Sequence, residues 1–316
     1  MVIGEGNIMR NTILYGDCRD TLKQFDEQAR TCVTSPPYYG LRNYGNEENQ
    51  IGQEKTPEEF IDQLVGVFKE VRNVLTDDGT LWINLGDSYY NYRPGKGQSY
   101  PKQSVSKTNQ DLPTQCNKRG NKLEGLKEKD LIGIPWMFAF AMRADGWYLR
   151  QDIIWHKPNP MPESVKDRCT KSHEYIFLLS KNKKYYYDNE AIKEPAKDWG
   201  TRDRTNGKYH NTGTGLAPHS GLSKSYDRKN KRSVWSITNK PYKGAHFAVF
   251  PPDLIEPCIL AGSEQGDIIL DPFMGSGTTG MVAKKHFRSY IGCELHEDYA
   301  SLQTDRIDSI PPQLVL

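Results

Sequence analysis

The feature that most constrains the fold of this chain is the alternation of short apolar segments with longer amphipathic segments of helical period. Strands are predicted at residues 12–15, 32–34, 81–85, 148–155, 175–179, 267–270 and 290–293, and helices at 57–75, 134–144, 253–261, 278–286 and from 296 onwards. Strands separated by helices are typical of βαβ units. We therefore predict an α/β fold with a mostly parallel sheet flanked by helices, in which ligands bind beyond the carboxyl ends of the strands.

The first long helix has a distinct beginning. Thr56-Pro57-Glu58-Glu59 has the form of a capping box, with Pro57 at the first helical position. Apolar residues then recur on one face of the helix, at positions 60, 64, 67, 68, 71 and 75. This face is predicted to pack against the sheet.

Charge is unevenly distributed along the chain. The net charge is +2, yet residues 91–123 carry seven Lys or Arg against one acid, and residues 193–233 carry ten against four. Each segment is therefore +6 and the remainder of the chain is −10. The two segments are either solvated loops or loops that neutralise phosphates. Interleaved tyrosines and Trp199 favour the second interpretation, because aromatic rings stack on exposed bases.

Several other classes of protein are not indicated. No run of 18 apolar residues is present, and the first residues, MVIGEGNIMRN, lack the apolar stretch of a signal peptide. We therefore expect a cytoplasmic protein without membrane contact. The six cysteines form no Cys-x-x-Cys pair, and the histidines show no ligand spacing. Neither a disulfide framework nor a metal site is predicted.

One informative motif is DPFMGSGTT, residues 271–279, between a predicted strand and a predicted helix. Gly275 and Gly277 allow backbone to approach a ligand closely, and the helix beginning near Thr278 directs free N–H groups at a carboxylate. Glu294, which ends the next strand, is suited to hold two ribose hydroxyls. A tight turn is the alternative interpretation. Because the third glycine of a dinucleotide fingerprint and the lysine of a P-loop are missing, an adenosine ligand bearing an amino acid fits best.

The second motif is TSPPYYG, residues 34–40, again just after a strand. Two prolines fix the backbone and donate no hydrogen bond, so nearby carbonyl groups face outward as acceptors. The hydroxyl of Ser35 and a carbonyl near Pro36 are suited to accept both protons of an amino group, and Tyr38 offers a face for stacking. These groups form a site for an aromatic amine, unless the motif is only a rigid turn at the strand end.

TSPPYYG followed by DPFMGSGTT resembles the amino-methylating DNA methyltransferases of restriction–modification systems and phages. The order of the two motifs is similar to the permuted arrangement of the β class. The resemblance covers most of the chain and implies a Rossmann-like, circularly permuted methyltransferase fold with basic loop insertions. It also implies S-adenosylmethionine as the cofactor, with no metal, and double-stranded DNA as the substrate.

The resemblance further assigns residues to roles. Catalysis would fall to Ser35, Pro36, Pro37 and Tyr38, and cofactor binding to Asp17, Phe247, Pro251, Asp271, Phe273, Gly275, Ser276, Gly277, Thr278 and Glu294. Asp17, in GDCRDTL, would lie near the adenine, and residues 247–255 would pack against the methionine. GTLWINLGDSY resembles the next core strand, with Asp87 and Tyr89 at its end. Residues 152–181 resemble the central hairpin region, including His173 and Glu174.

Ser35 bears on the choice of base. In the family, Ser-Pro-Pro-Tyr goes mainly with cytosine N4, and Asp- or Asn-Pro-Pro-Tyr mainly with adenine N6. A hydroxyl can donate to the cytosine ring as well as accept from its amino group, whereas a carboxylate only accepts. We therefore expect N4-cytosine methylation with base flipping. N6-adenine methylation and a catalytically inactive DNA-binding homologue stay open, although the intact Ser35, Tyr38 and Glu294 argue against the latter.

The domain organisation follows from these assignments. Residues 1–90, 124–190 and 236–316 are predicted to form the catalytic domain, residues 91–123 a basic insertion loop, and residues 191–235 a target-recognition region. A cognate restriction endonuclease that acts on the same site and a homodimer are left open as partners.

Overall fold

The main sheet has eight strands and is mostly parallel. The computed structural model describes residues 10–40, 50–90, 123–196, 227–239 and 250–311. In the order in which they lie in the sheet, the strands are β1 (Thr12–Tyr15), β10 (Ser289–Glu294), β9 (Ile268–Asp271), β2 (Ala29–Thr34), β3 (Leu75–Leu85), β5 (His173–Ser180), β4 (Tyr148–His156) and β8 (Val234–Ser236). Among these described strands only β5 runs antiparallel to its neighbours. The predicted α/β class is confirmed.

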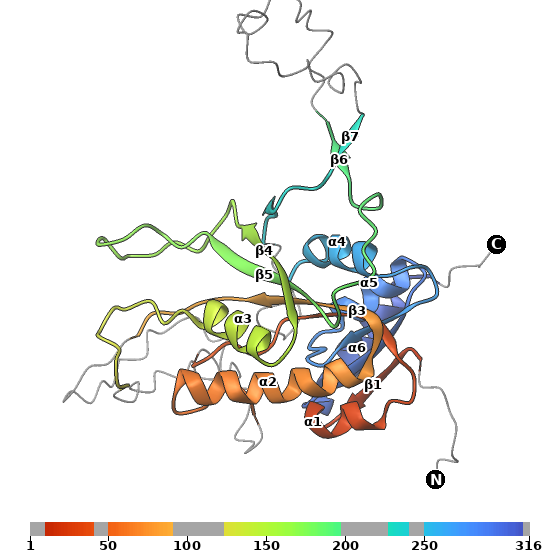
Figure 1. Cartoon of the computed structure of the whole chain (residues 1–316), viewed down its shortest axis with the longest axis horizontal. Helices are drawn as coiled ribbons and strands as arrows, with labels where there is room; N and C mark the ends of the chain where they lie inside the picture. Colours follow the sequence, from red (N-terminus) through yellow and green to blue (C-terminus); the bar gives the residue numbers. More distant parts are fainter. Residues whose placement is uncertain (1–9, 41–49, 91–122, 197–226, 240–249, 312–316) are drawn as a thin grey trace, which may run out of the picture.

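Helices cover both faces of the sheet (Figure 1). They are α1 (Cys18–Thr21), α2 (Pro57–Val74), α3 (Ile134–Ala144), α4 (Pro252–Gly262), α5 (Thr278–Lys285) and α6 (Ala300–Asp308), with short 3-10 turns η1 (Leu22–Gln24) and η2 (Glu297–Tyr299). Side chains of β3 alternate between two buried clusters. Leu81 and Ile83 pack with α2 and α3, whereas Trp82 packs with α4 and α5. This alternation is the period of a strand that is buried on both faces.

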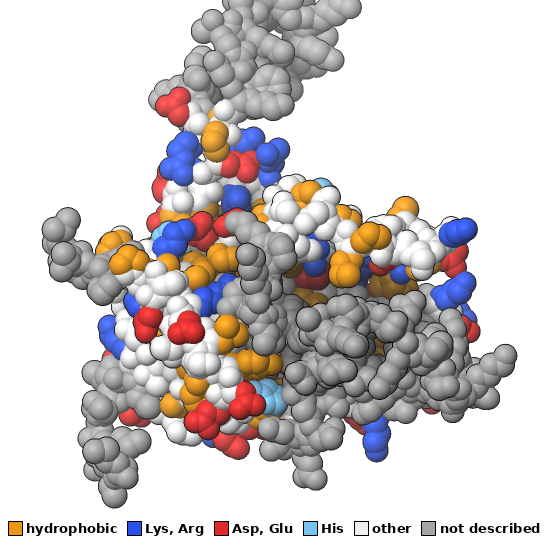
Figure 2. Space-filling view, turned by 180° about the vertical axis from the view of Figure 1, so that it is seen from behind, with side chains coloured by type: hydrophobic (Ala, Val, Ile, Leu, Met, Phe, Trp, Pro, Cys, Tyr) orange, Lys and Arg blue, Asp and Glu red, His pale blue; other side chains and the backbone are white. Residues whose placement is uncertain are grey.

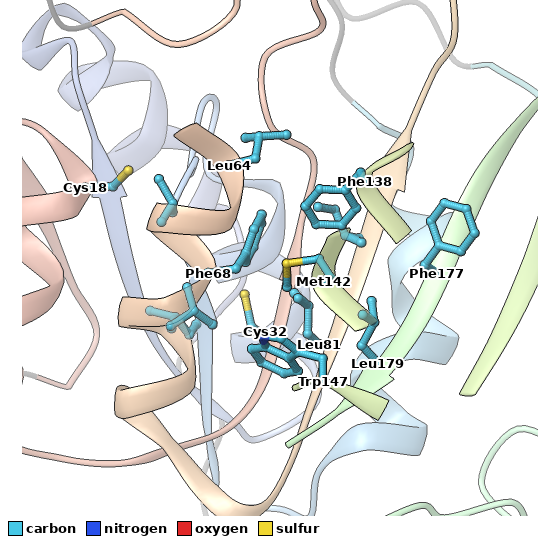
Figure 3. Close-up of a cluster of buried hydrophobic side chains, with 14 of the residues drawn as sticks. Cys18, Cys32, Leu64, Phe68, Leu81, Phe138, Met142, Trp147, Phe177 and Leu179 are labelled. Carbon is cyan, nitrogen blue, oxygen red and sulfur yellow. The ribbon is translucent and has the colours of Figure 1, made fainter. Parts of the chain in front are cut away.

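The cluster beneath α2 and α3 contains a ring contact between the two helices. Phe68 from α2 and Phe138 from α3 meet with ring centroids 5.5 Å apart, in the same cluster as Leu81 of β3 (Figure 3). The start of α2 is set as the sequence predicts, since the Glu59 N–H donates to Thr56 Oγ1 at 3.1 Å. This cluster therefore fixes α2 and α3 on one face of the sheet.

The strand β3 is longer than predicted. It begins at Leu75, directly after α2, and includes residues 77–79, an Asp-Asp-Gly turn sequence that precedes the predicted strand at 81–85. Ala29 of β2 pairs with Leu75 and Thr31 pairs with Thr80, so the register shifts and the turn residues form an irregularity within the strand. The early start of β3 at Leu75 could not be predicted from the sequence, because it depends on pairing with Ala29, which is far away in the chain.

A two-stranded stalk projects from the body (Figure 1). It consists of β6 (Glu194–Pro195) and β7 (Arg228–Lys229), which pair antiparallel. The stalk lies in the predicted target-recognition region, of which residues 197–226 are outside the described residues, as are 91–122 of the basic insertion. The strand β8, at the end of that region, joins the main sheet. The domain boundaries themselves stay a prediction.

None of the helices in the described ranges is long and apolar enough to cross a membrane.

Candidate active site

The sheet brings the two sequence motifs together. The strands β2 and β9 are parallel neighbours, with Cys32 opposite Leu270, so both motifs begin at the same edge of the sheet. The hydroxyl of Thr34 donates to Asp271 Oδ1 at 2.6 Å. The segment around Ser35 and the glycine loop after Asp271 are thus tied to each other at their first residues.

Asp271 is fully buried and its carboxylate is occupied within the protein. Besides Thr34, the Thr279 hydroxyl donates to it at 2.6 Å and the Phe273 N–H at 3.0 Å. Burial raises the pKa of Asp271 to about 6, against these three hydrogen bonds, which lower it. The carboxylate therefore joins β2, the glycine loop and α5, and any contribution to ligand binding passes through the loop.

The glycine loop adopts backbone that other residues rarely reach. Gly275 and Gly277 have φ of 51° and 78°, and Gly277 is the residue that precedes α5. The Gly275 N–H donates to Glu294 Oε2 at 2.7 Å, and its carbonyl accepts from Gln303 Nε2 at 2.7 Å. On the far side, Arg306 donates to the hydroxyl of Ser276. The loop is held from β10 and from α6.

Two carboxylates lie at adjacent strand ends beside this loop. The Gly16 N–H donates to the Glu294 carbonyl at 2.8 Å, which places Asp17 next to Glu294. Burial raises the pKa of Glu294 to about 7. Burial also opposes ionisation of Asp17, but hydrogen bonds from Arg19 hold the pKa of Asp17 below its ordinary value. Asp17 therefore ionises readily, whereas Glu294 ionises near neutral pH.

The second motif presents a hydroxyl and a ring at the same edge. Ser35 is partly exposed, Pro36 is buried, and the Tyr38 ring lies directly against Gly86, the residue after β3. A Cβ at Gly86 would come within 2.5 Å of Tyr38 Cε2. A small pocket beside the ring is lined by Tyr38, Tyr39, Gly86, Asp87, Ser88 and Ile134.

A polar network surrounds the hydroxyls of this motif. The Tyr38 hydroxyl donates to Glu174 Oε2 at 2.7 Å and lies 3.2 Å from Asn84 Oδ1. Asn84 Nδ2 donates to the same Glu174 oxygen at 3.2 Å. The other oxygen of Glu174 pairs with Lys157, and both side chains are about 15% exposed. Strands β3 and β5 and the end of β4 therefore support the motif that follows β2.

The comparisons with known proteins agree with this geometry. The family model for DNA methylases of the N6/N4 type matches residues 29–305. The chain belongs to the DNA methylase family. Type II methyltransferase M.SmaI of Serratia marcescens is 48% identical over 304 residues, which cover 96% of this chain and 92% of the relative. M.XycI of Xanthomonas campestris pv. cyanopsidis is 46% identical, with 95% and 89% covered.

Solved structures share the fold. The PvuII DNA methyltransferase described as cytosine-N4-specific superposes with a TM-score of 0.61 at 20% identity, over 96% of this chain and 89% of that one. A DNA modification methylase of Thermus thermophilus, complexed with S-adenosyl-L-methionine, gives 0.58 at 23% identity over 95% and 93%. The resemblance to restriction–modification DNA methyltransferases is confirmed, and with it the methyl donor of the family, S-adenosylmethionine.

The residues at the sheet edge fit this methyl donor. Glycines with positive φ admit a close ligand, the N-terminus of α5 favours a carboxylate, and Asp17 and Glu294 provide acceptors for hydroxyl and amino groups. In the described ranges no group of three or more His, Cys, Asp or Glu is arranged to hold a metal ion.

The predicted site residues of the methylase lie as follows. Asp17, Ser35 to Tyr38, the glycine loop and Glu294 share one edge of the sheet. Phe273 packs with Phe68 of the core, at 6.5 Å between ring centroids. Pro251 is buried at the start of α4. Phe247 lies outside the described residues. The individual roles of these residues stay predictions.

The sequence did not single out Asn84, Lys157, Gln303 or Arg306. Of these four residues only Asn84 could have been noticed in the sequence, because it is a polar residue within the apolar run Leu-Trp-Ile-Asn-Leu. In the structure it is 4% exposed. The other three contact the site from distant parts of the chain, so no local pattern marks them.

A substitution at Gly86 tests whether methyl transfer depends on the position of the Tyr38 ring. We expect Gly86→Ala to push the ring aside, because the new methyl group would overlap Tyr38 Cε2 and the backbone of β3 is fixed. Methyl transfer should fall roughly tenfold or more while cofactor affinity changes little. Steady-state kinetics and calorimetry measure the two effects. Gly66→Ala, on α2 with open space around it, is the matched control. Equal activity of both variants would contradict the prediction.

Proposed function

We propose that the chain transfers a methyl group from S-adenosylmethionine to the N4 amino group of cytosine in double-stranded DNA. The observation that carries the proposal is the placement of Ser35, in a Ser-Pro-Pro-Tyr segment, at the strand end that adjoins the glycine loop. A hydroxyl at this position suits an aromatic amino group, and membership of the DNA methylase family provides the reaction class.

Each residue of the site has a role in this proposal. S-adenosylmethionine, when bound, supplies an electrophilic methyl group. Ser35 Oγ accepts a hydrogen bond from the target amino group, which draws electron density onto the nitrogen. Pro36 and Pro37 hold the backbone carbonyl groups in place, and the Tyr38 ring stacks on the flipped base. The main requirement is positioning.

The glycine loop and its flanking acids hold the cofactor in the same proposal. Gly275 to Thr278 receive the amino-acid portion at the N-terminus of α5, together with Phe247 and Pro251. Glu294 accepts from the ribose hydroxyls, and Asp17 accepts from the adenine amino group. Asp271 and Phe273 keep the loop in this arrangement through the contacts described above.

Basic side chains support DNA as the partner. Figure 2 shows Lys and Arg side chains gathered where the stalk leaves the body. The basic residues of β7 and of the segments beside the stalk are Lys193, Arg228, Lys229, Lys231 and Arg232. Glu194 pairs with Lys229 and Arg232, which leaves the cluster positive overall. Such a surface neutralises phosphates. We propose that residues 191–235 read the target sequence and that residues 91–123 form a second DNA contact. A cognate endonuclease, a homodimer and a cytoplasmic location stay predictions.

One experiment decides the base. The chain is incubated with labelled S-adenosylmethionine and DNA of mixed sequence, and methylated nucleosides are identified by mass spectrometry. We expect N4-methylcytosine. Finding N6-methyladenine without N4-methylcytosine would assign the other base. Absence of label from all DNA, with cofactor binding intact, would indicate an inactive homologue.

The pKa of Glu294 predicts how cofactor affinity depends on pH. Ribose hydroxyls donate to the ionised carboxylate, so binding favours ionisation, whereas the free protein holds the pKa at about 7. Affinity should therefore rise with pH, by about tenfold between roughly pH 6 and 8, and then level off. Calorimetry over this range measures the slope. Glu294→Gln should bind more weakly and without this dependence, and an unchanged slope in that variant would rule out Glu294 as its source.

A further inference from the structure

Asn84 holds a fixed orientation beside the proposed catalytic hydroxyl. Its side chain is 4% exposed at the end of β3. The two amide hydrogens are both used: Nδ2 donates to Glu174 Oε2 at 3.2 Å and to the Tyr175 carbonyl at 3.1 Å. Because both acceptors lie on β5, the amide oxygen is turned towards Ser35 and Tyr38.

The hydroxyl of Tyr38 also lies within hydrogen-bond distance of this oxygen, but its proton has a closer acceptor. Tyr38 has one proton, and Glu174 Oε2 lies at 2.7 Å whereas Asn84 Oδ1 lies at 3.2 Å. A carboxylate at the shorter distance is the stronger acceptor. Lys157 pairs with the other oxygen of Glu174, so the carboxylate is held in place. The amide oxygen of Asn84 is therefore left for Ser35, whose Oγ is 3.4 Å away.

We propose that Asn84 is a positioning residue that directs the Ser35 proton away from the substrate. Ser35 Oγ then meets the target amino group with its lone pairs, as an acceptor. The inference rests on the proposed function, since it concerns the same amino group. It also alters the expectation from the sequence: with its proton committed to Asn84, Ser35 does not donate to the ring of the base. The network Lys157–Glu174–Asn84–Ser35 acts from the residue after β4, from β5 and from β3 on the segment after β2.

A double-mutant cycle tests the proposal with the full chain. We expect Asn84→Ala to lower kcat for DNA methylation by about 10- to 100-fold, with the dissociation constant of S-adenosylhomocysteine within about twofold. In the Ser35→Ala background the same change should lower kcat by less than about threefold, because the proton it orients is gone. Asn182→Ala is the matched control: it lies just beyond the end of β5 that is far from Glu174, and its amide donates to the Asp77 carbonyl at 2.7 Å.

A second variant separates orientation from packing, because Asn84→Ala also leaves a cavity. Asn84→Asp keeps the volume. When protonated, the carboxyl group of this variant can donate to Glu174 and accept from Ser35 as the amide does, although it gives up the second donation, to the Tyr175 carbonyl. The titratable groups around this position are Tyr38, Glu174 and, behind Glu174, Lys157 and Lys171. The negative charge of Glu174 favours the protonated form. At saturating cofactor, the ratio of its kcat to that of the natural protein should fall as pH rises from about 6 to 8.5.

The outcomes distinguish this inference from the function on which it rests. Equal losses from Asn84→Ala in both backgrounds, or a kcat ratio for Asn84→Asp that does not change with pH, would overturn the role of Asn84 while DNA methylation by the natural protein stands. If the natural protein methylates no DNA, the proposed function fails, and the role of Asn84 fails with it. The proposal is supported if Asn84→Ala lowers kcat only when Ser35 is present and if the kcat ratio of Asn84→Asp to the natural protein falls as pH rises.

Discussion

Ser35→Ala is expected to lower kcat for DNA methylation by about 100-fold or more, while affinity for S-adenosylmethionine changes by less than about twofold. The reason is geometric. Ser35 belongs to the segment proposed to face the base, whereas the groups proposed to hold the cofactor come from the ends of β1 and β10, the loop after β9 and the segment before α4. Removing one acceptor for the amino group affects the transition state and leaves the cofactor contacts in place.

A matched variant controls for the loss of a hydroxyl. Ser180 is a fully buried serine whose hydroxyl donates to the Asn182 carbonyl at 2.9 Å, and it pairs with Thr80 in the middle of β3. Ser180→Ala should leave kcat and affinity unchanged. Turnover and calorimetry on both variants provide the comparison. Equal losses in turnover and in cofactor affinity for Ser35→Ala would count against its role at the base.

Asp271→Ala is expected to have the largest effect on folding stability, a loss of about 2–4 kcal/mol in the free energy of unfolding. Three donors converge on this carboxylate in a fully buried position, from Thr34, Phe273 and Thr279. Without it the Thr34 hydroxyl and the Phe273 N–H lose this acceptor, Thr279 keeps only a longer contact to the Val33 carbonyl at 3.3 Å, and the contact between the two motifs is lost. Denaturant unfolding measures the change.

Two variants sharpen this prediction. Asp271→Asn keeps the volume and one oxygen, and the Thr hydroxyls can rotate to accept from its amide, so its cost should be less than half that of Asp271→Ala. Asp62→Ala, on the exposed side of α2, should change stability by no more than about 0.5 kcal/mol. If Asp271→Ala were as mild as Asp62→Ala, the carboxylate would not be a structural link between the motifs.

The raised pKa of Asp271 predicts the direction in which folding stability changes with pH. Its folded-state value of about 6 lies above the ordinary 3.8, so the folded protein binds the proton more tightly than the unfolded chain does. This group favours folding most below pH 3.8, and that contribution disappears as pH rises past about 6. In Asp271→Asn, this part of the pH dependence of stability should vanish.

The local elements were predictable because their signals lie within a few residues of one another. The capping box at Thr56 and the proline at residue 57 set the start of α2, and α3 has the predicted bounds. The two motifs were recognisable for the same reason, since the prolines after Ser35 and the glycines after Asp271 determine local backbone. By contrast, the early start of β3 depends on pairing with β2, which is a tertiary contact.

By itself the sequence determined the fold class, the family and the two motifs proposed to face the ligands, since these depend on hydrophobic period and on short runs of residues. The tertiary structure alone decided how those residues are used. Asp271, expected at the cofactor, is buried as a link between the motifs, and Asn84, unremarked in its strand, orients towards Ser35. Hydrogen bonds depend on which strand ends become neighbours, and strand order is set by packing across the whole chain rather than by any local run of residues.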